Sequence, residues 1–434
     1  MIVPPRPGHA PAVSVPLSYL VAGAVAFIAA TLGVVWLAPE LAEHYYHPRV
    51  VALTHTITLG FITLTIMGAS YQLIPIVLQR PIWSERLARW QFCILVLSVA
   101  GMVGHFYLGS RRGLLAAAVL LAVGVAAHLL NVGLSLRGFT AWSFTARLIV
   151  LGYTGLALTV IVGLALGADR IRAFLPGSLV STVHAHFHLA LLGWVTPMLL
   201  GVAARVYPMF LLAPEPAGWP ARLQFWGLAL GLPAVVVGLF GVPALVGPGA
   251  LAVALAALGH AVWVARMARH RKRPRLDRGL YFVLTGTAFL LPVTSLGLGF
   301  AWGLVSGPRV ALAYAVLGLG GWISLTIIGM MLKILPFLVW YRVYSPRVGK
   351  APVPTLPQLA WPAGEASAYM LLTAGMALLP IAIVTGDATW IRSAGVVLSL
   401  GALAFGASIG RILYHLTGGV LRQERAATAE AHAR

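Results

Sequence analysis

Three histidines within five residues carry the strongest chemical signal in the sequence. His184, His186 and His188 lie in an apolar stretch. On a helix, at about 100° per residue, His184 and His188 share one face and His186 projects from nearly the opposite face. Neutral imidazole is a good ligand for iron, copper and zinc, and a haem needs only one or two such nitrogens from facing helices. We therefore predict that this segment binds haem or a metal and can serve two neighbouring sites.

His55 is the other histidine that we expect at this site. It lies near the start of an earlier apolar run, at about the same depth as the three histidines above if both runs cross a membrane in the same direction. Ionisable groups inside a bilayer are costly and usually functional. The candidate cofactor ligands are therefore His55, His184, His186 and His188.

Two further histidines, His105 and His128, are candidate metal ligands. We expect His105 at the same membrane face as His55, and His128 nearer the middle of the membrane. For both, the alternative is a histidine that only hydrogen-bonds to neighbouring carbonyls and hydroxyls in the core. A lone membrane histidine such as His260 favours that structural interpretation.

The composition excludes a soluble enzyme. Of 434 residues, 60% are hydrophobic and 9% are charged, against roughly 25% charged residues in a soluble domain. The net charge of +20 would suggest nucleic acid in a soluble chain. Here the basic residues lie between apolar runs, as they do in membrane proteins, so the expected partner is the lipid bilayer and no nucleic acid.

Cysteine usage limits the cofactors. The single cysteine, Cys93, excludes an internal disulfide, a thiolate zinc cluster and an iron–sulfur cluster. The sequence also has no C-x-x-C-H motif. Any haem must therefore be held without a covalent thioether bond, which predicts a haem b with histidine ligands.

The apolar runs predict an all-α, polytopic membrane protein with about twelve transmembrane helices, since each span needs about 20 apolar residues. The expected spans are 17–38, 50–78, 87–108, 113–136, 144–168, 179–212, 222–242, 248–267, 279–306, 309–340, 366–386 and 390–415. The whole chain, 1–434, is expected to form a single membrane domain, with 417–434 as a cytoplasmic tail.

The distribution of Lys and Arg predicts the orientation. The side of the N-terminus carries most of them, including the run around Arg271 and Lys272. Positive residues mark the cytoplasmic side, so both termini are expected inside a bacterial-type inner membrane. The opposite side carries only Arg49, Arg111, Arg112, Arg170, Arg172, Arg309 and Arg392.

One pattern of small residues occurs three times. Each copy has two glycines eight residues apart and a proline fifteen residues after the first glycine, and successive copies are roughly 130 residues apart, which corresponds to four helices. The copies are Gly60, Gly68 and Pro75; Gly193, Gly201 and Pro208; and Gly321, Gly329 and Pro336. The pattern predicts three pseudo-symmetric four-helix repeats, at about 17–136, 144–267 and 279–415.

The segment from His186 to Trp194 resembles a known motif. It contains H-x-H-x-x-x-x-G, as in subunit I of the heme-copper oxidase superfamily, especially the cbb3-type oxidase and nitric oxide reductase branches. His55-Thr56 followed by Gly60 is similar to the helix-2 haem-ligand region of that family. Twelve helices in three quartets is also the family architecture.

The resemblance implies roles for individual histidines. Carried over by motif, His186 would bind a high-spin haem, His188 a low-spin haem, and His55 would be the partner of His188. The family has its H-x-H on helix 10, whereas here the motif is on helix 6 and Tyr314 and Val316 occupy the matching helix-10 positions. The family's paired histidines for copper lie on helix 7, and the seventh span here has no histidine. Copper or another second metal is therefore an open expectation.

These observations favour two functions and leave a third open. The first is an oxidoreductase, an oxidase or nitric oxide reductase homologue that handles O2 or NO near the outer face and takes electrons from a separate protein or a quinol. The second is a non-enzymatic, NnrS-like haem and metal protein for nitric oxide tolerance. The third is a metal transporter. All ten acidic residues fall in loops, span ends or the tail, which argues against proton pumping, and a homo-oligomer is left open.

Overall fold

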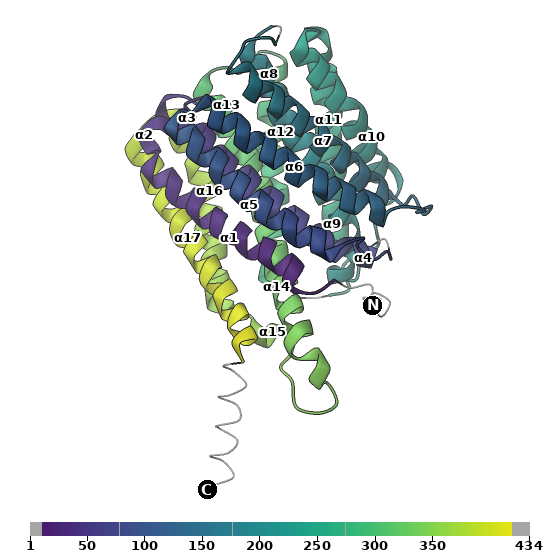
Figure 1. Ribbon diagram of the computed structural model, residues 1–434. Coiled ribbons are helices and arrows are strands. Elements are labelled where there is room, and N and C mark those ends of the chain that lie inside the picture. The colour runs from purple at the N-terminus through teal and green to yellow at the C-terminus, as the bar shows by residue number, and fades with distance from the viewer. Residues whose placement is uncertain (1–10, 78, 176, 274, 419–434) are drawn as a thin grey trace.

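The chain folds as a bundle of long helices (Figure 1). The computed structural model describes residues 11–77, 79–175, 177–273 and 275–418, and all regular secondary structure in these ranges is helical. Most of the predicted tail, 417–434, lies outside the described residues.

Twelve helical stretches are long and apolar enough to cross a membrane, which confirms the predicted class and number of spans. The spans are span 1 (α1, Ser14–Trp36), span 2 (α3, Pro48–His55; η1, Thr56–Thr63; α4, Leu64–Val77), span 3 (α5, Glu85–Leu108), span 4 (α6, Arg111–Ser135), span 5 (α7, Phe144–Asp169), span 6 (α8, Leu179–His188; η2, Leu189–Val195; α9, Thr196–Leu211), span 7 (α10, Gly218–Phe240), span 8 (α11, Val246–Arg269), span 9 (α12, Arg278–Ala301), span 10 (α13, Pro308–Val316; η4, Leu317–Ser324; α14, Leu325–Val343), span 11 (α16, Pro362–Thr385) and span 12 (α17, Ala388–Tyr414). The 3-10 turns η3 (Pro243–Leu245) and η6 (His415–Thr417) extend spans 8 and 12. Short connecting helices are α2 (Ala38–Glu43), η5 (Ser345–Arg347) and α15 (Leu356–Leu359).

Several spans begin at residues that cap a helix. The hydroxyl of Ser84 accepts a hydrogen bond from the Leu87 amide at the start of α5, and the Asp277 carboxylate accepts one from the Leu280 amide at the start of α12. Such caps pair backbone N–H groups that the first helical turn leaves without partners. They place polar residues at the ends of the spans and leave the apolar residues between them.

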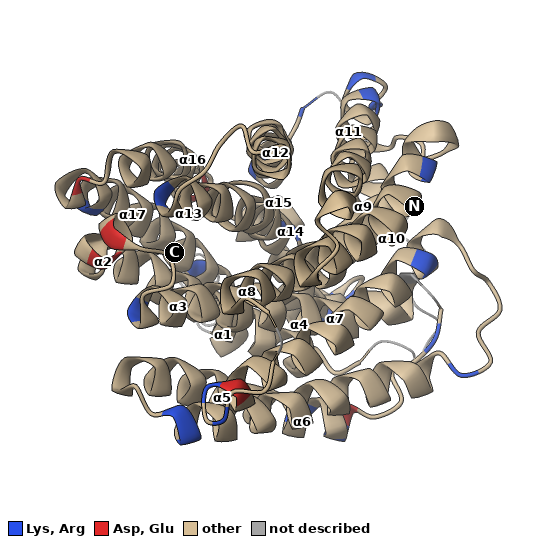
Figure 2. Cartoon of the chain, turned by 90° about the horizontal axis from the view of Figure 1, so that it is seen from above, with Lys and Arg blue, Asp and Glu red and all other residues tan. Residues whose placement is uncertain are grey.

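Contacts between loops show that successive spans run in opposite directions. At one end of the bundle, Arg80 donates to the Gly138 carbonyl, joining the loops after spans 2 and 4. At the other end, Arg170 donates to the Tyr46 hydroxyl, joining the loops after spans 5 and 1. Viewed from above, Lys, Arg, Asp and Glu gather at helix ends and loops rather than along the long helices (Figure 2).

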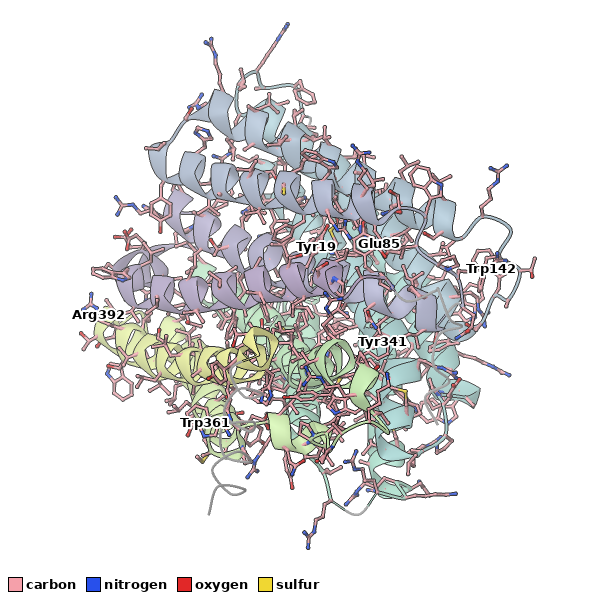
Figure 3. All side chains as sticks on the ribbon, turned by 60° about the horizontal axis from the view of Figure 1, so that its bottom comes forward. Tyr19, Glu85, Trp142, Tyr341, Trp361 and Arg392 are labelled. Atoms are coloured by element: carbon pink, nitrogen blue, oxygen red, sulfur yellow. The ribbon has the colours of Figure 1, made fainter. Side chains whose placement is uncertain are left out.

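The first span is fixed by polar contacts near its start. The Tyr19 hydroxyl donates to the Ala88 carbonyl at 2.7 Å, and the Glu85 carboxylate accepts a hydrogen bond from the Ala12 amide. Tyr19 and Glu85 lie close together in Figure 3, where α1 meets α5. Trp142 and Trp361, also labelled there, are exposed aromatic side chains outside the spans, as is typical of residues at a membrane–water interface.

The three glycine patterns coincide with an unusual local structure. Spans 2, 6 and 10 each contain a π-helical segment (η1, η2 and η4), and the first glycine of each pattern lies within it. The second glycine of each pattern packs on the preceding span, with Gly68 against Tyr19, Gly201 against Leu148 and Gly329 against Gly279. π-helical turns are rare and frequent at functional sites. The arrangement is consistent with three repeats, which stay a prediction.

Candidate functional site

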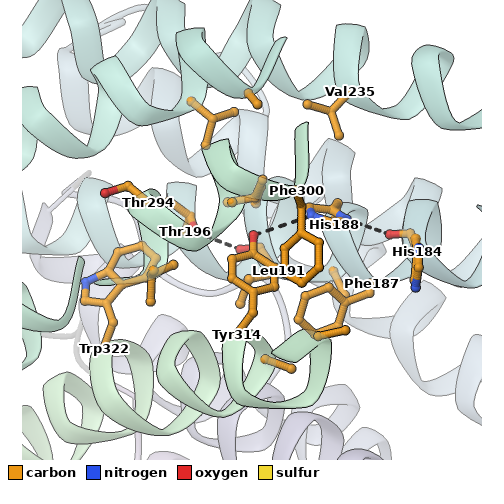
Figure 4. Close-up of a pocket in the computed structure, with 18 of the residues that line it drawn as sticks. His184, Phe187, His188, Leu191, Thr196, Val235, Thr294, Phe300, Tyr314 and Trp322 are labelled. Carbon is orange, nitrogen blue, oxygen red and sulfur yellow. Dashed lines mark hydrogen bonds between the residues drawn. The ribbon is translucent and has the colours of Figure 1, made fainter. Parts of the chain in front are cut away.

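A cavity of about 450 Å³ lies among spans 6 to 10 and reaches span 2 at one edge. Its lining is mostly aliphatic and aromatic, with few polar groups. Figure 4 shows His188 pointing into this space between His184 and Tyr314. The histidines that line it are His55, His184, His186, His188 and His260, so the structure brings together all four predicted cofactor ligands.

His55 is the last residue of α3, directly before the π-helical segment η1. Its Nδ1 lies 2.8 Å from the Val51 carbonyl oxygen one turn earlier, and its ring stacks on Phe106 of α5 at a centroid distance of 5.0 Å. A ring N–H that donates to a carbonyl fixes the tautomer and leaves Nε2 as the free lone pair. His55 therefore presents Nε2 as a potential metal ligand.

His186 lies on span 6 and lines the same cavity as His55. The His186 ring packs on α7, where a Cβ atom at Gly163 would lie 3.0 Å from it. The His186 Nδ1 is buried and makes no hydrogen bond of normal geometry among the described residues, although the backbone of Thr159 lies beside it. The motif resemblance pairs His55 with His188, but the His188 ring turns toward Tyr314 of α13, and His186 projects from the other face of span 6 into the same cavity as His55.

His188 turns toward span 10 instead. Its Nδ1 lies 2.7 Å from the His184 carbonyl oxygen, and its Nε2 lies 3.5 Å from the Tyr314 hydroxyl. Like His55, it is the last residue before a π-helical segment. The opposite projection of His186 and His188 is the geometry expected from their spacing, and it directs them to two different neighbours.

His184 has a partner of its own. The Tyr45 hydroxyl lies 3.1 Å from the His184 Nε2. Burial raises the pKa of Tyr45, which lies in the loop between α2 and α3, so its phenol stays protonated and shares a hydrogen bond with the imidazole. Because its Nε2 is hydrogen-bonded to Tyr45, His184 contributes to the site mainly through its backbone carbonyl, which orients the His188 ring.

His105 does not line the cavity. It lies near the end of α5, and its ring packs so closely on Gly113 of α6 that a Cβ there would lie 2.3 Å from it. Its Nδ1 is buried without a hydrogen-bond partner among the described residues. No group of three His, Cys, Asp or Glu residues in the described part of the chain is arranged to hold a metal ion. A metal at His105 stays a prediction.

His128 belongs to a buried polar network away from the cavity. Its Nδ1 lies 3.0 Å from the Tyr71 hydroxyl and its Nε2 lies 3.3 Å from the Tyr153 hydroxyl. Tyr71 also donates to Gln91, and Asn131 donates to Tyr71. Because both ring nitrogens already have partners, this geometry favours the structural interpretation of His128 over a metal ligand.

We therefore expect His128→Ala to lower stability without changing cofactor content. The substitution removes the imidazole that bridges Tyr71 and Tyr153, and although Tyr71 keeps Gln91 and Asn131, loss of a buried hydrogen-bond partner at Tyr153 costs about 1–3 kcal/mol. The thermal midpoint of the purified protein in detergent, measured with its cofactor content, checks this. A loss of bound cofactor at unchanged stability would instead indicate that His128 is a cofactor ligand.

Sequence reasoning missed two polar residues of the site. Tyr45 lies in a loop, and no spacing in the sequence connects it to His184. Tyr314 lies at the position in span 10 that matches His186 in span 6. This correspondence between repeats is the one feature of the sequence that could have identified Tyr314 as a site residue. His260 is buried and hydrogen-bonds to Gln224, as expected for a structural histidine, but it also lines the cavity.

The comparisons with known proteins bear on the fold. No protein-family model matches the sequence, and no curated protein matches it. A solved structure that does match is a heme-copper terminal oxidase dimer, with a TM-score of 0.69 and 13% identity over 92% of this chain and 84% of that one. At this identity the likeness shows a shared fold across nearly the whole chain.

Proposed function

We propose that the protein is a membrane haem protein in which His55 and His186 bind a haem b from its two sides. The observation that carries the proposal is that both imidazoles line one apolar cavity from different spans. The His55 ring is oriented by its hydrogen bond to the Val51 carbonyl, which leaves its Nε2 free. Imidazoles oriented in this way are the usual axial ligands of haem iron.

The residues present fit a haem better than a bare ion. His55 and His186 supply two nitrogens, and the described residues offer no third His, Cys, Asp or Glu to complete a metal site. A macrocycle brings four nitrogens of its own, so two protein ligands suffice. The Nδ1 of His186 is buried and has no hydrogen-bond partner among the described residues. Such an unpaired polar atom is expected where a ligand completes the site.

The surroundings of the two histidines would tune the cofactor. The Arg170 guanidinium lies 5.5 Å from the centre of the Phe106 ring and interacts electrostatically with His55. A cation at this end of the site would pair with an anionic substituent on the macrocycle and favour the more electron-rich state of the iron. When held by two histidines, the haem would supply the redox centre that no side chain provides.

We further propose a redox or O2/NO-handling role near the outer face, as a divergent relative of heme-copper oxidase subunit I. The shared fold with a heme-copper terminal oxidase supports this relationship. Electrons would come from a separate protein or a quinol, and copper or another metal stays a prediction. The absence of acidic residues from the middle of the spans argues against proton pumping.

A second candidate is a non-enzymatic, NnrS-like haem and metal protein for nitric oxide tolerance. It is favoured by span 7, Gly218–Phe240, which has no histidine. Binding of carbon monoxide to the reduced protein distinguishes an open reactive site from a closed electron-transfer site, because a gas ligand needs an open coordination position on the iron. A metal transporter has less support, since the predicted ligands gather near one face instead of lining a path.

We propose a bacterial-type inner membrane with both termini in the cytoplasm. The basic residues Arg80, Arg273 and Lys350 belong to loops on the side that is predicted to be inside, where positive residues collect. A homo-oligomer is compatible with this placement.

An optical spectrum of the purified, detergent-solubilised protein tests the haem proposal. We expect a reduced-minus-oxidised spectrum with a sharp α-band, a pyridine hemochrome of haem b, and iron in at least equal amount to the chain. Protein expressed with haem available but isolated colourless and iron-free would overturn the proposal. Copper or zinc in that sample would indicate that the same histidines bind a metal ion instead of a haem.

A further inference from the structure

Two adjacent segments carry most of the arginines on the face that is predicted to be outside. Arg111 and Arg112 are the first residues of α6, and Arg170 and Arg172 follow the end of α7. The segments are in contact, because the Arg111 guanidinium donates to the Arg170 carbonyl at 3.2 Å. Viewed from above, basic segments lie beside α5 at this end of the bundle (Figure 2). We call the three exposed arginines, Arg111, Arg112 and Arg172, the outer basic patch.

The protein does not neutralise the outer basic patch. None of its three arginines makes an ion pair within the part of the chain that the structure describes. Asp169 is the only acidic residue in the segments 105–113 and 169–178. Its carboxylate accepts hydrogen bonds from the Phe174 and Leu175 amides, at 2.7 and 2.8 Å. The patch therefore keeps a net positive charge for a partner.

Two general rules disfavour arginines at these positions. Arg111 and Arg112 occupy the first turn of α6, where the helix dipole repels cations. The outer side of a membrane protein is also poor in Lys and Arg. Residues that break a local rule without a structural return are expected at functional sites. The patch is therefore better explained by a binding role than by folding.

Apolar side chains are exposed among the arginines. Leu108 at the end of α5 is 77% exposed, and Ile171 and Phe174 in the segment after α7 are 44% and 58% exposed. Arginine together with aromatic and aliphatic side chains is typical of protein–protein interfaces. A quinol is uncharged and gains little from three arginines. The composition of the surface therefore fits an acidic protein.

A short path leads from this surface to His55. The Arg170 guanidinium lies between two rings, with its Cζ 5.6 Å from the centre of Tyr46 and 5.5 Å from the centre of Phe106. The Phe106 ring stacks on His55 at a centroid distance of 5.0 Å and an interplanar angle of 29°. Only Arg170 and Phe106 thus separate the patch from a proposed haem ligand. Because electron transfer slows steeply with distance, this is a favourable place for electrons to enter.

We propose that the outer basic patch docks an acidic electron-carrier protein, which reduces the haem by way of Phe106 and His55. This inference rests on the proposed haem function and selects a carrier protein over a quinol as the electron donor. One electron leaves the reduced carrier and converts ferric iron to ferrous iron, and no covalent bond forms or breaks. The patch steers and orients the carrier, since charge complementarity acts mainly on the rate of association.

The test is stopped-flow reduction of the purified, haem-loaded full chain by an acidic probe protein, reduced plant-type [2Fe–2S] ferredoxin. The α-band reports the rate, which should rise with ferredoxin concentration and fall as salt screens the charges. The triple variant Arg111→Glu, Arg112→Glu and Arg172→Glu should lower the second-order rate constant at least about tenfold. Its haem content and reduced spectrum should match those of the unmodified protein.

The opposite face supplies the matched control. Arg269, Lys272 and Arg275 are also exposed and form no ion pair within the described part of the chain. Changing all three to Glu reverses the same charge far from His55, and the rate constant should stay within about twofold.

Two results would overturn the docking site and leave the proposed function standing. One is a rate constant that falls equally in both triple variants or in neither. The other is an outer variant that loses co-purified anionic lipid at an unchanged rate constant, which would identify the patch as a lipid site. Protein without any haem would overturn both proposals.

Discussion

His55→Ala and His186→Ala are each expected to remove the haem bound between spans 2 and 6. Loss of a residue that only orients a ligand already costs 10–100-fold in affinity for comparable metal sites, so loss of a ligand itself should cost more than about 100-fold. The measurement is the α-band and haem content of each purified variant. Both should fold, because each substitution removes a partly exposed side chain that lines a cavity.

His270→Ala provides the control for this pair. The Nδ1 of His270 lies 2.8 Å from the Arg266 carbonyl oxygen one turn earlier, which is the same local bond that His55 makes, but His270 is exposed at the end of α11. Its haem content should match that of the unmodified protein. If His55→Ala and His186→Ala kept the full low-spin spectrum, the histidines would not be the ligands.

Gly155→Leu is expected to disrupt assembly of the bundle around the site. A Cβ atom at Gly155 of α7 would lie 2.1 Å from the carbonyl oxygen of Gly193, and backbone cannot move aside as a flexible side chain can. Overpacking typically costs about 1–3 kcal/mol, and more when backbone must shift. We expect at least about 3 kcal/mol, seen as poor accumulation in the membrane or early thermal unfolding with loss of haem.

Gly104→Leu is the matched control for Gly155→Leu. Gly104 lies inside α5, and a Cβ there would have no neighbour within 4 Å. Its thermal midpoint and haem content should stay close to those of the unmodified protein. Equal behaviour of the two variants would mean that the contact between α7 and η2 does not hold span 6 in place.

The fold could be predicted from the sequence because the membrane imposes strong rules. A span must be long and apolar, so the twelve runs were visible, and the predicted 179–212 differs by one residue from the observed Leu179–Leu211. The π-helical segments could not be predicted. They depend on how η1, η2 and η4 pack in three dimensions, and the glycines within them were visible only as a spacing pattern.

The site could be predicted in part. Helical periodicity correctly placed His186 and His188 on different faces, and depth correctly brought His55 to the same cavity. Which neighbour each histidine meets depends on the order of spans around the bundle, which periodicity does not encode. The approach of His188 to Tyr314 and of Tyr45 to His184 therefore required coordinates.

The most direct test of the central proposal is an experimental density map of the full chain purified with its cofactor in a lipid environment. We predict a planar macrocycle between spans 2 and 6, with Nε2 of His55 and Nε2 of His186 bound to its iron from opposite faces of the macrocycle. A map in which the two imidazoles pack against each other, or bind only a protein partner, with no macrocycle between them would contradict it.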